Sequence, residues 1–226
     1  YYIGFNVKMK ELSDPKVRQA LRYLIDYDGM ANSFLKGAAQ VHQSFWAEGF
    51  WASYNENPYS FDPEKAKALL AEAGYPNGFS CTLLSTAQYG MHKSTAEVVQ
   101  QSLAGIGVQV ALKLPDWATR VSLGNRGQYE FVVQGTTADN NDPDGLASVL
   151  DSSLPANNAR SVNLPVPDIH ELFAKGREEF DQAKRRAIYA ELETRALDEC
   201  PRVGLAWRAQ GYAMAKNLVG FRNLPA

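Results

Sequence analysis

The residues best placed to bind a charged group follow directly after an apolar run. Residues 129–134, YEFVVQ, are rich in aromatic and β-branched side chains, which predicts a short buried strand. Ligands of open α/β sheets lie outside the carboxyl ends of the strands, so the polar loop that follows is a candidate site. The candidate ligand-binding residues of this loop are Asp139, Thr136, Thr137 and Asn140.

The carboxylates of this region also have structural interpretations. Asp139 could instead cap local backbone N–H groups in an Asx-turn, and both interpretations remain open. Asp142 precedes Pro143 and Asp144 precedes Gly145, a pattern typical of turns and helix starts. The stretch 140–151 is similar in spacing to a calcium-binding EF-hand loop, but it contains a proline and follows a strand. We therefore expect no metal and no cofactor.

The sequence contains none of the common catalytic patterns. There is no Ser–His–Asp order, no GxSxG, no P-loop and no HExxH, and the carboxylates of the loop have no evident partner positioned for catalysis. The three histidines, His42, His92 and His170, lie far apart in the sequence, and we expect each on the surface. A binding protein is therefore favoured over an enzyme.

Composition and charge exclude several classes of partner. The chain has 226 residues and a formal net charge of −2, without a cluster of basic residues. Nucleic acid and membrane surfaces are therefore not expected partners. No run of 18 apolar residues is present. Cys81 and Cys200 match no metal spacing and are predicted to form either one disulfide or two buried thiols.

Helices are predicted where caps and apolar periodicity coincide. Asp14 with Pro15 begins one helix and Asp62 with Pro63 begins another, which ends at Gly74. Asp28 is predicted to cap a helix that runs to Leu35. A capping box of Ser94 and Glu97 begins a helix that ends at Gly107. Further helices are predicted at 146–150, 168–180 and 182–199, the last two as an antiparallel pair.

Alternating residues predict the strands. Strands are expected at 1–9, 79–83, 108–114 and 129–134, with short final strands at 203–207 and 212–215. The strand, helix and strand between residues 79 and 114 form a βαβ unit, which implies a parallel pair. Residues 117–126 supply a second crossover. The chain is therefore predicted to be α/β, with the loop at Gly135 on the carboxyl edge of the sheet.

Residues 38–60 show no sustained periodicity but contain many aromatic side chains, including Trp46. A loop of this length is either functional or wrongly assigned. Trp46 could therefore pack the loop onto the domain or contact a solute. Trp207 and Arg208, at the end of a late strand, are further candidates, and Trp207 could equally fill the core.

The order of these segments strongly resembles the second lobe of the large extracytoplasmic solute-binding proteins of ABC importers, family 5, which includes oligopeptide-, dipeptide-, nickel- and haem-binding receptors. The resemblance rests on segments spread almost from end to end of the chain. They are DPKVRQALRYLIDYDGM at 14–30, YSFDPEKAKALLAEAGYPNGF at 59–79, VVQQSLAGIGVQV at 98–110, TADNNDPDG at 137–145, RRAIYAELETRALDECPRVGLAW at 185–207 and LVGF at 218–221.

The resemblance implies a periplasmic-binding-protein-like lobe of type II, with a mixed sheet and flanking helices. It also implies that residues 1–226 are a single lobe, with the first lobe and the C-terminal return absent. The complete receptor would close on its solute like a Venus flytrap and deliver it to membrane permease subunits, in the periplasm or outside the cytoplasm. Arg18 and Asp26 match recurrent positions of the family on one predicted helix, which implies a structural pair.

The resemblance also assigns roles to the candidate site. In peptide-binding members an aspartate at the position of Asp139 pairs with the free amino group of the peptide. Thr136 stands where those members often have tryptophan, so a peptide and another small cation-bearing solute both remain open. An alternative function is a ligand-sensing module of a regulator. An upstream signal sequence would favour transport, and an upstream helix-turn-helix would favour regulation.

Overall fold

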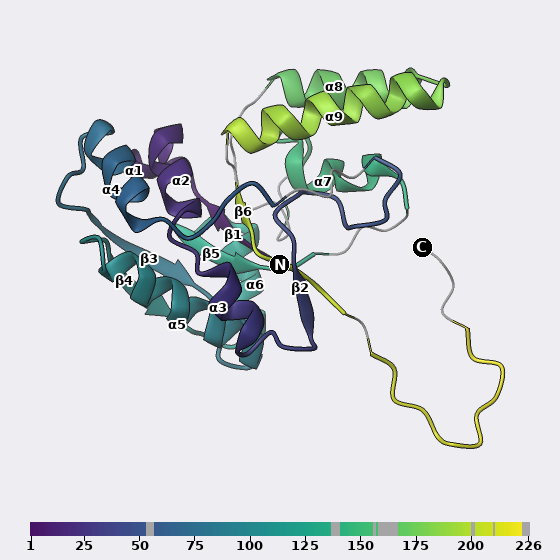
Figure 1. Ribbon diagram of the computed structural model, residues 1–226, viewed down its shortest axis with the longest axis horizontal. Coiled ribbons are helices and arrows are strands. Elements are labelled where there is room, and N and C mark those ends of the chain that lie inside the picture. The colour runs from purple at the N-terminus through teal and green to yellow at the C-terminus, as the bar shows by residue number, and fades with distance from the viewer. Residues whose placement is uncertain are drawn as a thin grey trace.

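A five-stranded mixed sheet forms the centre of the computed structural model, which describes residues 1–52, 57–136, 141–155, 157, 167–199, 202–209 and 211–222 (Figure 1). The strand order is β4-β3-β5-β1-β6. β3 (Ser80–Leu84) pairs in parallel with both β4 (Gln109–Lys113) and β5 (Phe131–Gln134). β1 (Tyr2–Phe5) runs antiparallel to β5 and to β6 (Arg202–Gly204). The predicted α/β fold with flanking helices is confirmed.

Two helical crossovers connect the parallel strands. α5 (Gly90–Ala104) joins β3 to β4, and α6 (Trp117–Asn125) joins β4 to β5, as the sequence predicts. The carboxyl ends of β3, β4 and β5 therefore meet at one edge of the sheet. Because β1 is antiparallel to β5, with Tyr2 opposite Gln134, its first residue lies at the same edge.

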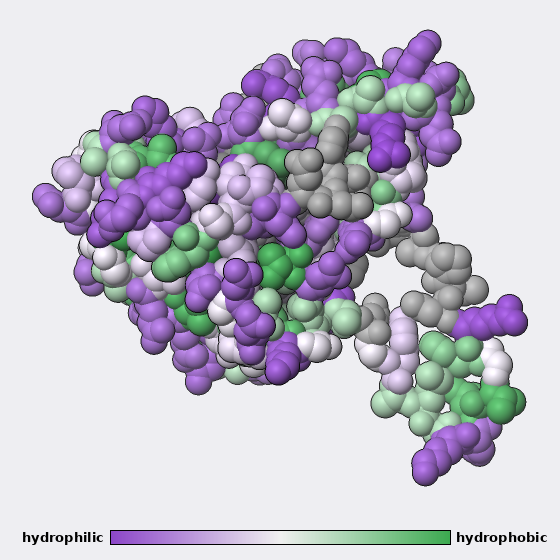
Figure 2. All heavy atoms as spheres, in the orientation of Figure 1, coloured by the Kyte–Doolittle hydropathy of each residue, from purple (hydrophilic) through white to green (hydrophobic). Residues whose placement is uncertain are grey.

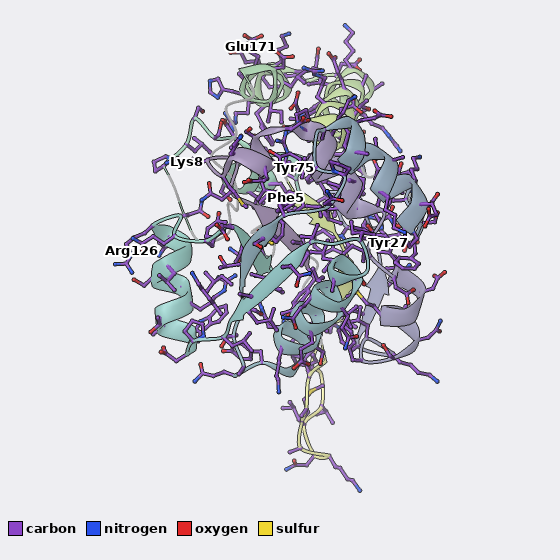
Figure 3. The ribbon with its side chains drawn as sticks, turned by 90° about the vertical axis from the view of Figure 1, so that its left-hand side faces the viewer. Phe5, Lys8, Tyr27, Tyr75, Arg126 and Glu171 are labelled. Atoms are coloured by element: carbon purple, nitrogen blue, oxygen red, sulfur yellow. The ribbon has the colours of Figure 1, made fainter. Side chains whose placement is uncertain are left out.

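β1 is buried on both faces, and it is shorter than the predicted strand at 1–9. Ile3 and Phe5 contribute to one hydrophobic core, whereas Tyr2 contributes to a second core on the opposite face. The alternation in the sequence therefore divides side chains between two cores, not between core and solvent. Figure 3 shows Phe5 inside the protein and Arg126 and Glu171 at its periphery.

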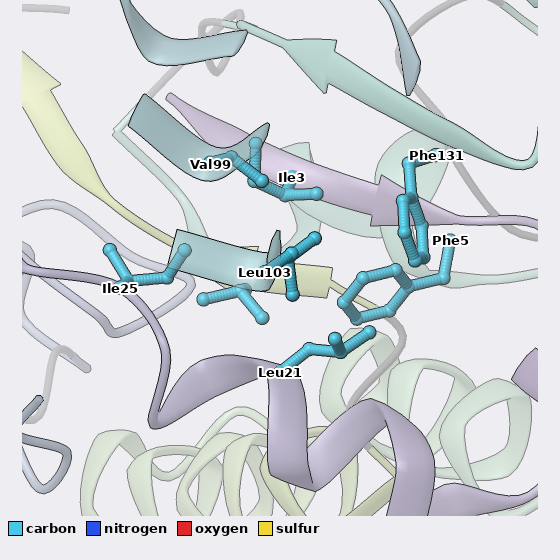
Figure 4. Close-up of a pocket in the computed structure, with 8 residues that line it drawn as sticks. Ile3, Phe5, Leu21, Ile25, Val99, Leu103 and Phe131 are labelled. Atoms are coloured by element: carbon cyan, nitrogen blue, oxygen red, sulfur yellow. The ribbon is translucent and has the colours of Figure 1, made fainter. Parts of the chain in front are cut away.

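The first core lies between the sheet and the helices α2 (Pro15–Arg22), α3 (Tyr27–Asn32), α4 (Pro63–Glu72) and α5. Asp14 and Asp62 cap α2 and α4 through their side chains, with proline at the first turn, as predicted. A cavity of about 10 Å³ between β1, α2 and α5 is lined only by apolar side chains (Figure 4). It is too small for a solute.

Two predicted helix starts are wrong. Asp26 caps α3 by accepting a hydrogen bond from the backbone N–H of Gly29 at 2.8 Å, and Asp28 lies inside the helix, which ends at Asn32. α5 begins at Gly90, so Ser94 and Glu97 are interior residues. Glu97 forms an ion pair with Lys93 at 3.7 Å, one helical turn away. The glutamate predicted as part of a capping box thus serves in an ordinary i,i+4 ion pair inside the helix.

The predicted structural role of Arg18 is confirmed, but its predicted partner is wrong. Arg18 and Asp26 lie on different helices, because α2 ends at Arg22. The Arg18 guanidinium is buried and donates to the backbone carbonyls of Leu12 at 2.7 Å and of Glu199 at 2.7 Å. It therefore joins α2 and the short helix α1 (Lys10–Ser13) to the end of α9 (Gln182–Glu199).

The second core packs residues 45–52 against α7 (Ala147–Leu150), α8 (Pro167–Glu178) and α9, which lie on one side of the sheet (Figure 1). α7 follows the 3-10 helix η1 (Pro143–Leu146), and α8 and α9 pack side by side as the predicted pair. Within residues 38–52 the packing interpretation of the aromatic loop is supported. β2 (Ala39–Val41) pairs antiparallel with β7 (Ala206–Arg208) as a separate two-stranded ribbon.

Residues 211–222 extend away from the body, and every described residue of this tail is exposed (Figure 2). The predicted strand at 212–215 is wrong, since the structure shows no strand there and a strand requires a partner. The tail exposes large apolar side chains: Tyr212, Met214, Leu218, Val219 and Phe221. Among the described helices, none combines the length and the apolar character needed to cross a membrane.

Cys81 is a buried free thiol in β3, and burial raises the pKa of this thiol to about 12. A thiol with such a pKa is protonated at neutral pH and therefore unreactive. Cys200 lies outside the described residues.

Gly78 permits a close approach between the chain before β3 and the chain before β4. A β-carbon at Gly78 would lie 2.3 Å from the carbonyl carbon of Gly107, and Gly78 has φ of +74°. Gly74 has φ of +88° but open space around its hydrogen. We expect Gly78→Ala to lower the free energy of unfolding by at least about 3 kcal/mol and Gly74→Ala by about 1 kcal/mol. Equal losses in chemical denaturation would contradict the steric argument.

Glu193 joins α9 to the start of the aromatic loop. Its buried carboxylate accepts hydrogen bonds from the hydroxyl of Ser44 and from the backbone N–H of Phe45 at 3.1 Å. Glu193→Ala leaves these buried donors unpaired, so we expect the free energy of unfolding to fall by about 2 to 4 kcal/mol. The exposed Glu191→Ala on the same helix is the matched control, with a change below about 0.5 kcal/mol. A similar effect of both variants would refute this role.

Candidate functional site

A pocket of about 460 Å³ opens at the sheet edge where the three parallel strands end. We call it the edge pocket. It brings together the residue before β1, the loop after β3 with the first turn of α5, the start of α6 after β4, the loop after β5, and the ribbon strand β7. The residues that line it are Tyr1, Tyr89, Met91, His92, Trp117, Gly135, Thr136, Trp207 and Arg208. The expectation that the loop at Gly135 lies on the carboxyl edge of the sheet is confirmed, and the edge pocket opens beside it.

Three of the sequence-predicted site residues line the edge pocket. Thr136 reaches it from the end of β5, and Trp207 and Arg208 reach it from β7. Trp207 is half-buried and Arg208 is exposed. Both also border a second pocket, of about 430 Å³, which includes Gln40 and Glu48. The ribbon therefore separates two hollows and presents the same two side chains to both.

The other candidates of the loop, Thr137, Asp139 and Asn140, lie outside the described residues. Thr136 is the last described residue before them and borders the edge pocket. Asp139 is three residues further along the chain. Its assignment as the solute-binding carboxylate therefore stays a prediction.

Trp46 is not part of the edge pocket. Its side chain is fully buried in the second core, where the indole Nε1–H donates to the backbone carbonyl of Pro143 at 3.0 Å. Its ring packs edge-on against Tyr189 with 6.0 Å between centroids. Trp46 thus anchors the aromatic loop to the segment that follows residues 137–140.

Four rings from three separate segments pack together along one wall of the edge pocket. His92 contacts Tyr1, Tyr89 and Trp117 with centroid separations of 5.0, 5.9 and 5.7 Å, and Tyr89 packs edge-on against Trp117 at 5.1 Å. Such edge-to-face contacts add to the stabilisation from burial. This ring cluster provides flat apolar surfaces against which a solute can pack.

A buried cation lies next to the ring cluster. Arg120 is fully buried, its guanidinium carbon lies 5.2 Å from the ring centre of Trp117, and it donates to the backbone carbonyl of Val133 at 2.6 Å. Burial and then the positive charge of Arg120 lower the pKa of His92 to about 4. His92 is therefore neutral at pH 7 and acts as a polar ring, not as a cation.

The expectation of three surface histidines holds for one of them. His170 is half exposed and lies 2.9 Å from the carboxylate of Asp151. His92 is buried in the ring cluster, and His42 is buried with Nε2 2.6 Å from the carbonyl oxygen of Trp46. The wide spacing of the histidines along the chain did not predict their burial, because the topology of the fold determines which rings meet.

The carboxylates after the loop have the predicted structural roles. Asp142 caps η1 and binds Arg185 through two contacts, at 2.7 and 2.8 Å, which lowers the pKa of Asp142. Asp144 pairs with Arg177 at 2.8 Å. These ion pairs attach the segment after the loop to α8 and α9. In the described part of the chain, no group of three or more His, Cys, Asp or Glu side chains could hold a metal ion.

Most of the ring cluster was not identified from the sequence. Tyr89 follows the end of β3 and Trp117 follows the end of β4, the same positions relative to their strands as the loop after β5. The rule that directed attention to residues 135–140 applies equally to these two loops. Tyr1 could be found only from the antiparallel pairing of β1 with β5.

A family model and two relatives of known name match this chain. Residues 1–158 match the family described as bacterial extracellular solute-binding proteins, family 5 Middle. The chain is 30% identical over 230 residues to the dipeptide-binding protein of Escherichia coli K12, and 30% identical over 231 residues to the glutathione-binding protein GsiB of Pectobacterium atrosepticum. These alignments cover 97% and 99% of the chain but only 42% and 45% of the relatives.

Solved structures with the same fold include the PBP AgaA of A. tumefaciens R10 in complex with agropinic acid, with a TM-score of 0.86 and 36% identity. They also include the periplasmic binding protein DppA of Helicobacter pylori in complex with the peptide STSA, with a TM-score of 0.83 and 30% identity. The similarity covers 92% and 91% of the chain, and 43% and 40% of those two proteins. The chain thus spans less than half the length of the proteins that it matches.

The lowered pKa of His92 predicts a pH dependence of stability. The unfolded state binds more protons than the folded state between the unfolded pKa near 6.5 and the folded pKa of about 4, so stability is lost as the pH falls through this window. We expect a loss of about 2 to 3 kcal/mol from His92 between pH 7.5 and pH 4.5. The variant His92→Phe should show a correspondingly shallower dependence in chemical denaturation. Parallel curves for variant and wild type would disprove the assignment.

Proposed function

The chain belongs to the bacterial extracellular solute-binding proteins of family 5, and on this premise we propose that it is one lobe of an ABC-importer receptor. In this proposal the complete receptor captures a small solute between two lobes and releases it to membrane permease subunits. The observation that carries the proposal is the edge pocket, which lies at the carboxyl edge of the sheet and includes Thr136, Trp207 and Arg208. Its volume falls within the usual range for small-molecule sites.

The lengths of the relatives support the two-lobe proposal. The matched relatives are more than twice as long as the chain, and the apolar side chains of the tail at 211–222 are exposed in the part of the chain that the structure describes. We propose that the tail packs against the first lobe in the full-length protein. The edge pocket then forms one wall of a cleft, and closure of the cleft removes the solute from water.

We propose a short peptide or another small solute with a cationic group as the cargo. The relatives include proteins named for dipeptide and glutathione, and one neighbour holds the peptide STSA. Asp139 is the proposed partner of the cationic group. The other proposed contacts are Thr137 and Asn140 of the same loop, and Thr136, Trp207 and Arg208, which line the edge pocket. A carboxylate in a cleft that dries on closure is costly to bury alone, so a cationic solute favours the closed state.

The protein is proposed to work outside the cytoplasm, since its family is extracellular. Proteins of this family and its structural neighbours bind solutes, and we propose the same noncatalytic role for this chain. Native mass spectrometry of the full-length protein, purified from its own host, tests the proposal. We expect a retained small solute that is released on denaturation. Full-length protein that neither carries a solute nor binds peptides would refute the receptor function.

Asp139→Asn removes the proposed charge without changing the size of the side chain. We expect peptide binding to the full-length receptor to weaken by about 1 to 3 kcal/mol, because the cationic group of the solute loses its partner in the closed cleft. Isothermal titration calorimetry measures the effect. Asp144→Asn, whose carboxylate pairs with Arg177, is the matched control and should bind normally. Unchanged affinity of the Asp139 variant would remove this residue from the site.

A further inference from the structure

Aromatic rings form most of the wall of the edge pocket. Four of them belong to the ring cluster, and the fifth, Trp207, enters the pocket from the ribbon strand β7. The Trp207 ring packs edge-on against the buried His42, with 6.3 Å between centroids. Two aromatic surfaces, held by different elements, therefore border one hollow of about 460 Å³.

The rings of the cluster have fixed orientations before any solute arrives. Tyr89 packs edge-on against Trp117 with 5.1 Å between centroids, and His92 contacts the same indole at 5.7 Å. Tyr89 is nevertheless half exposed and Trp117 is only partly covered, so both present ring surface to the pocket. A preformed surface loses little conformational entropy on binding, and a flat ring gains both buried area and ring-to-ring contact there.

A pocket lined by rings can also bind a cation, but the charges around this one oppose it. The guanidinium carbon of Arg120 lies 5.2 Å from the ring centre of Trp117, so this ring already contacts a cation. Arg208 adds a positive charge to the lining, and none of the described lining residues is acidic. Burial, and after it the charges of Arg120 and Arg208, hold His92 neutral by lowering its pKa to about 4. A further cation on this wall would be repelled, whereas an uncharged ring would not.

We infer that the edge pocket binds its solute through a flat, uncharged ring that packs against Tyr89, Trp117 and Trp207, and that the charge of Arg120 excludes cationic rings from this wall. The inference rests on the proposed receptor function and narrows the cargo to small solutes that carry an aromatic or heteroaromatic ring. A saturated side chain of similar size binds less tightly because it lacks the ring-to-ring contacts. The proposed cationic group of the solute lies outside this aromatic wall.

The test uses the full-length receptor, with its cargo removed by unfolding and refolding. The probes are three dipeptides with alanine first and, second, phenylalanine, cyclohexylalanine or para-aminomethyl-phenylalanine. Because their ends are identical, differences in affinity report on the side chain alone. In isothermal titration calorimetry we expect the phenylalanine probe to bind about three- to tenfold more tightly than the cyclohexylalanine probe. We expect it to exceed the cationic probe by at least about tenfold.

Two variants locate the ring of the solute. Tyr89→Leu and Trp207→Leu each keep an apolar side chain but remove a ring. The phenylalanine probe should therefore lose about three- to tenfold in affinity, and the cyclohexylalanine probe much less. Tyr89 is half exposed, so its replacement does not endanger the fold. Phe180→Leu, at an almost fully exposed site outside the edge pocket, is the matched control, with unchanged affinities expected.

Arg120→Gln separates the charge of this residue from its structural role. Arg120 donates to the backbone carbonyl of Val133 at 2.6 Å, and glutamine keeps a hydrogen-bond donor but carries no charge. We expect the ratio between the affinities of the phenylalanine and cationic probes to shrink by at least about threefold, because the repulsion is removed. A purely structural role would weaken both probes alike. If this variant does not fold, the three probes on the unchanged receptor decide.

A cyclohexylalanine or cationic probe that binds as well as the phenylalanine probe overturns the inference and leaves the receptor function intact. Ring variants that keep the full preference for phenylalanine, or an Arg120→Gln variant that discriminates as strongly as the unchanged receptor, also overturn it. If no dipeptide binds, the cargo found by native mass spectrometry decides, since a cargo with an uncharged flat ring supports the inference and one without it does not. Neither a cargo nor any binding would instead contradict the proposed function itself.

Discussion

The antiparallel insertion of β1 between β5 and β6 is the constraint on which the site depends. A sheet of parallel strands alone would gather only loops at its carboxyl edge. Because β1 runs the other way, Tyr1, the residue before it, lies beside Gly135 and meets the ring of His92 there. The pocket thus combines loops from the parallel strands with the start of a strand that is distant from them in sequence.

The same strand couples the two cores. Ile3 and Phe5 pack on one face with α2 and α5, and Tyr2 packs on the other with Phe45, below Arg202, whose guanidinium carbon lies 4.4 Å from the Tyr2 ring centre. Because both faces belong to one strand, a loss of packing on one face of β1 also disturbs the packing on its other face. This double burial ties the sheet edge, and the pocket that opens there, to both cores.

Local sequence patterns were sufficient for most of the fold. The caps at Asp14 and Asp62, the βαβ unit and the position of the loop at Gly135 each depend on interactions within one or two elements. Errors arose where distant contacts decide the outcome. Arg18 binds carbonyls of other elements, not Asp26, and His92 is buried by rings from three segments. The tail at 212–215 contains alternating residues but pairs with no strand in the described part of the chain.

The exposed tail also determines how this polypeptide behaves when it is separated from the rest of its protein. Five large apolar side chains are exposed on a projecting segment. They form a surface that favours self-association at high protein concentration. Copies of the isolated lobe would therefore self-associate through this segment, and solubility would improve if it were shortened or given charged residues. The tail thus carries most of the large apolar side chains that are exposed among the described residues.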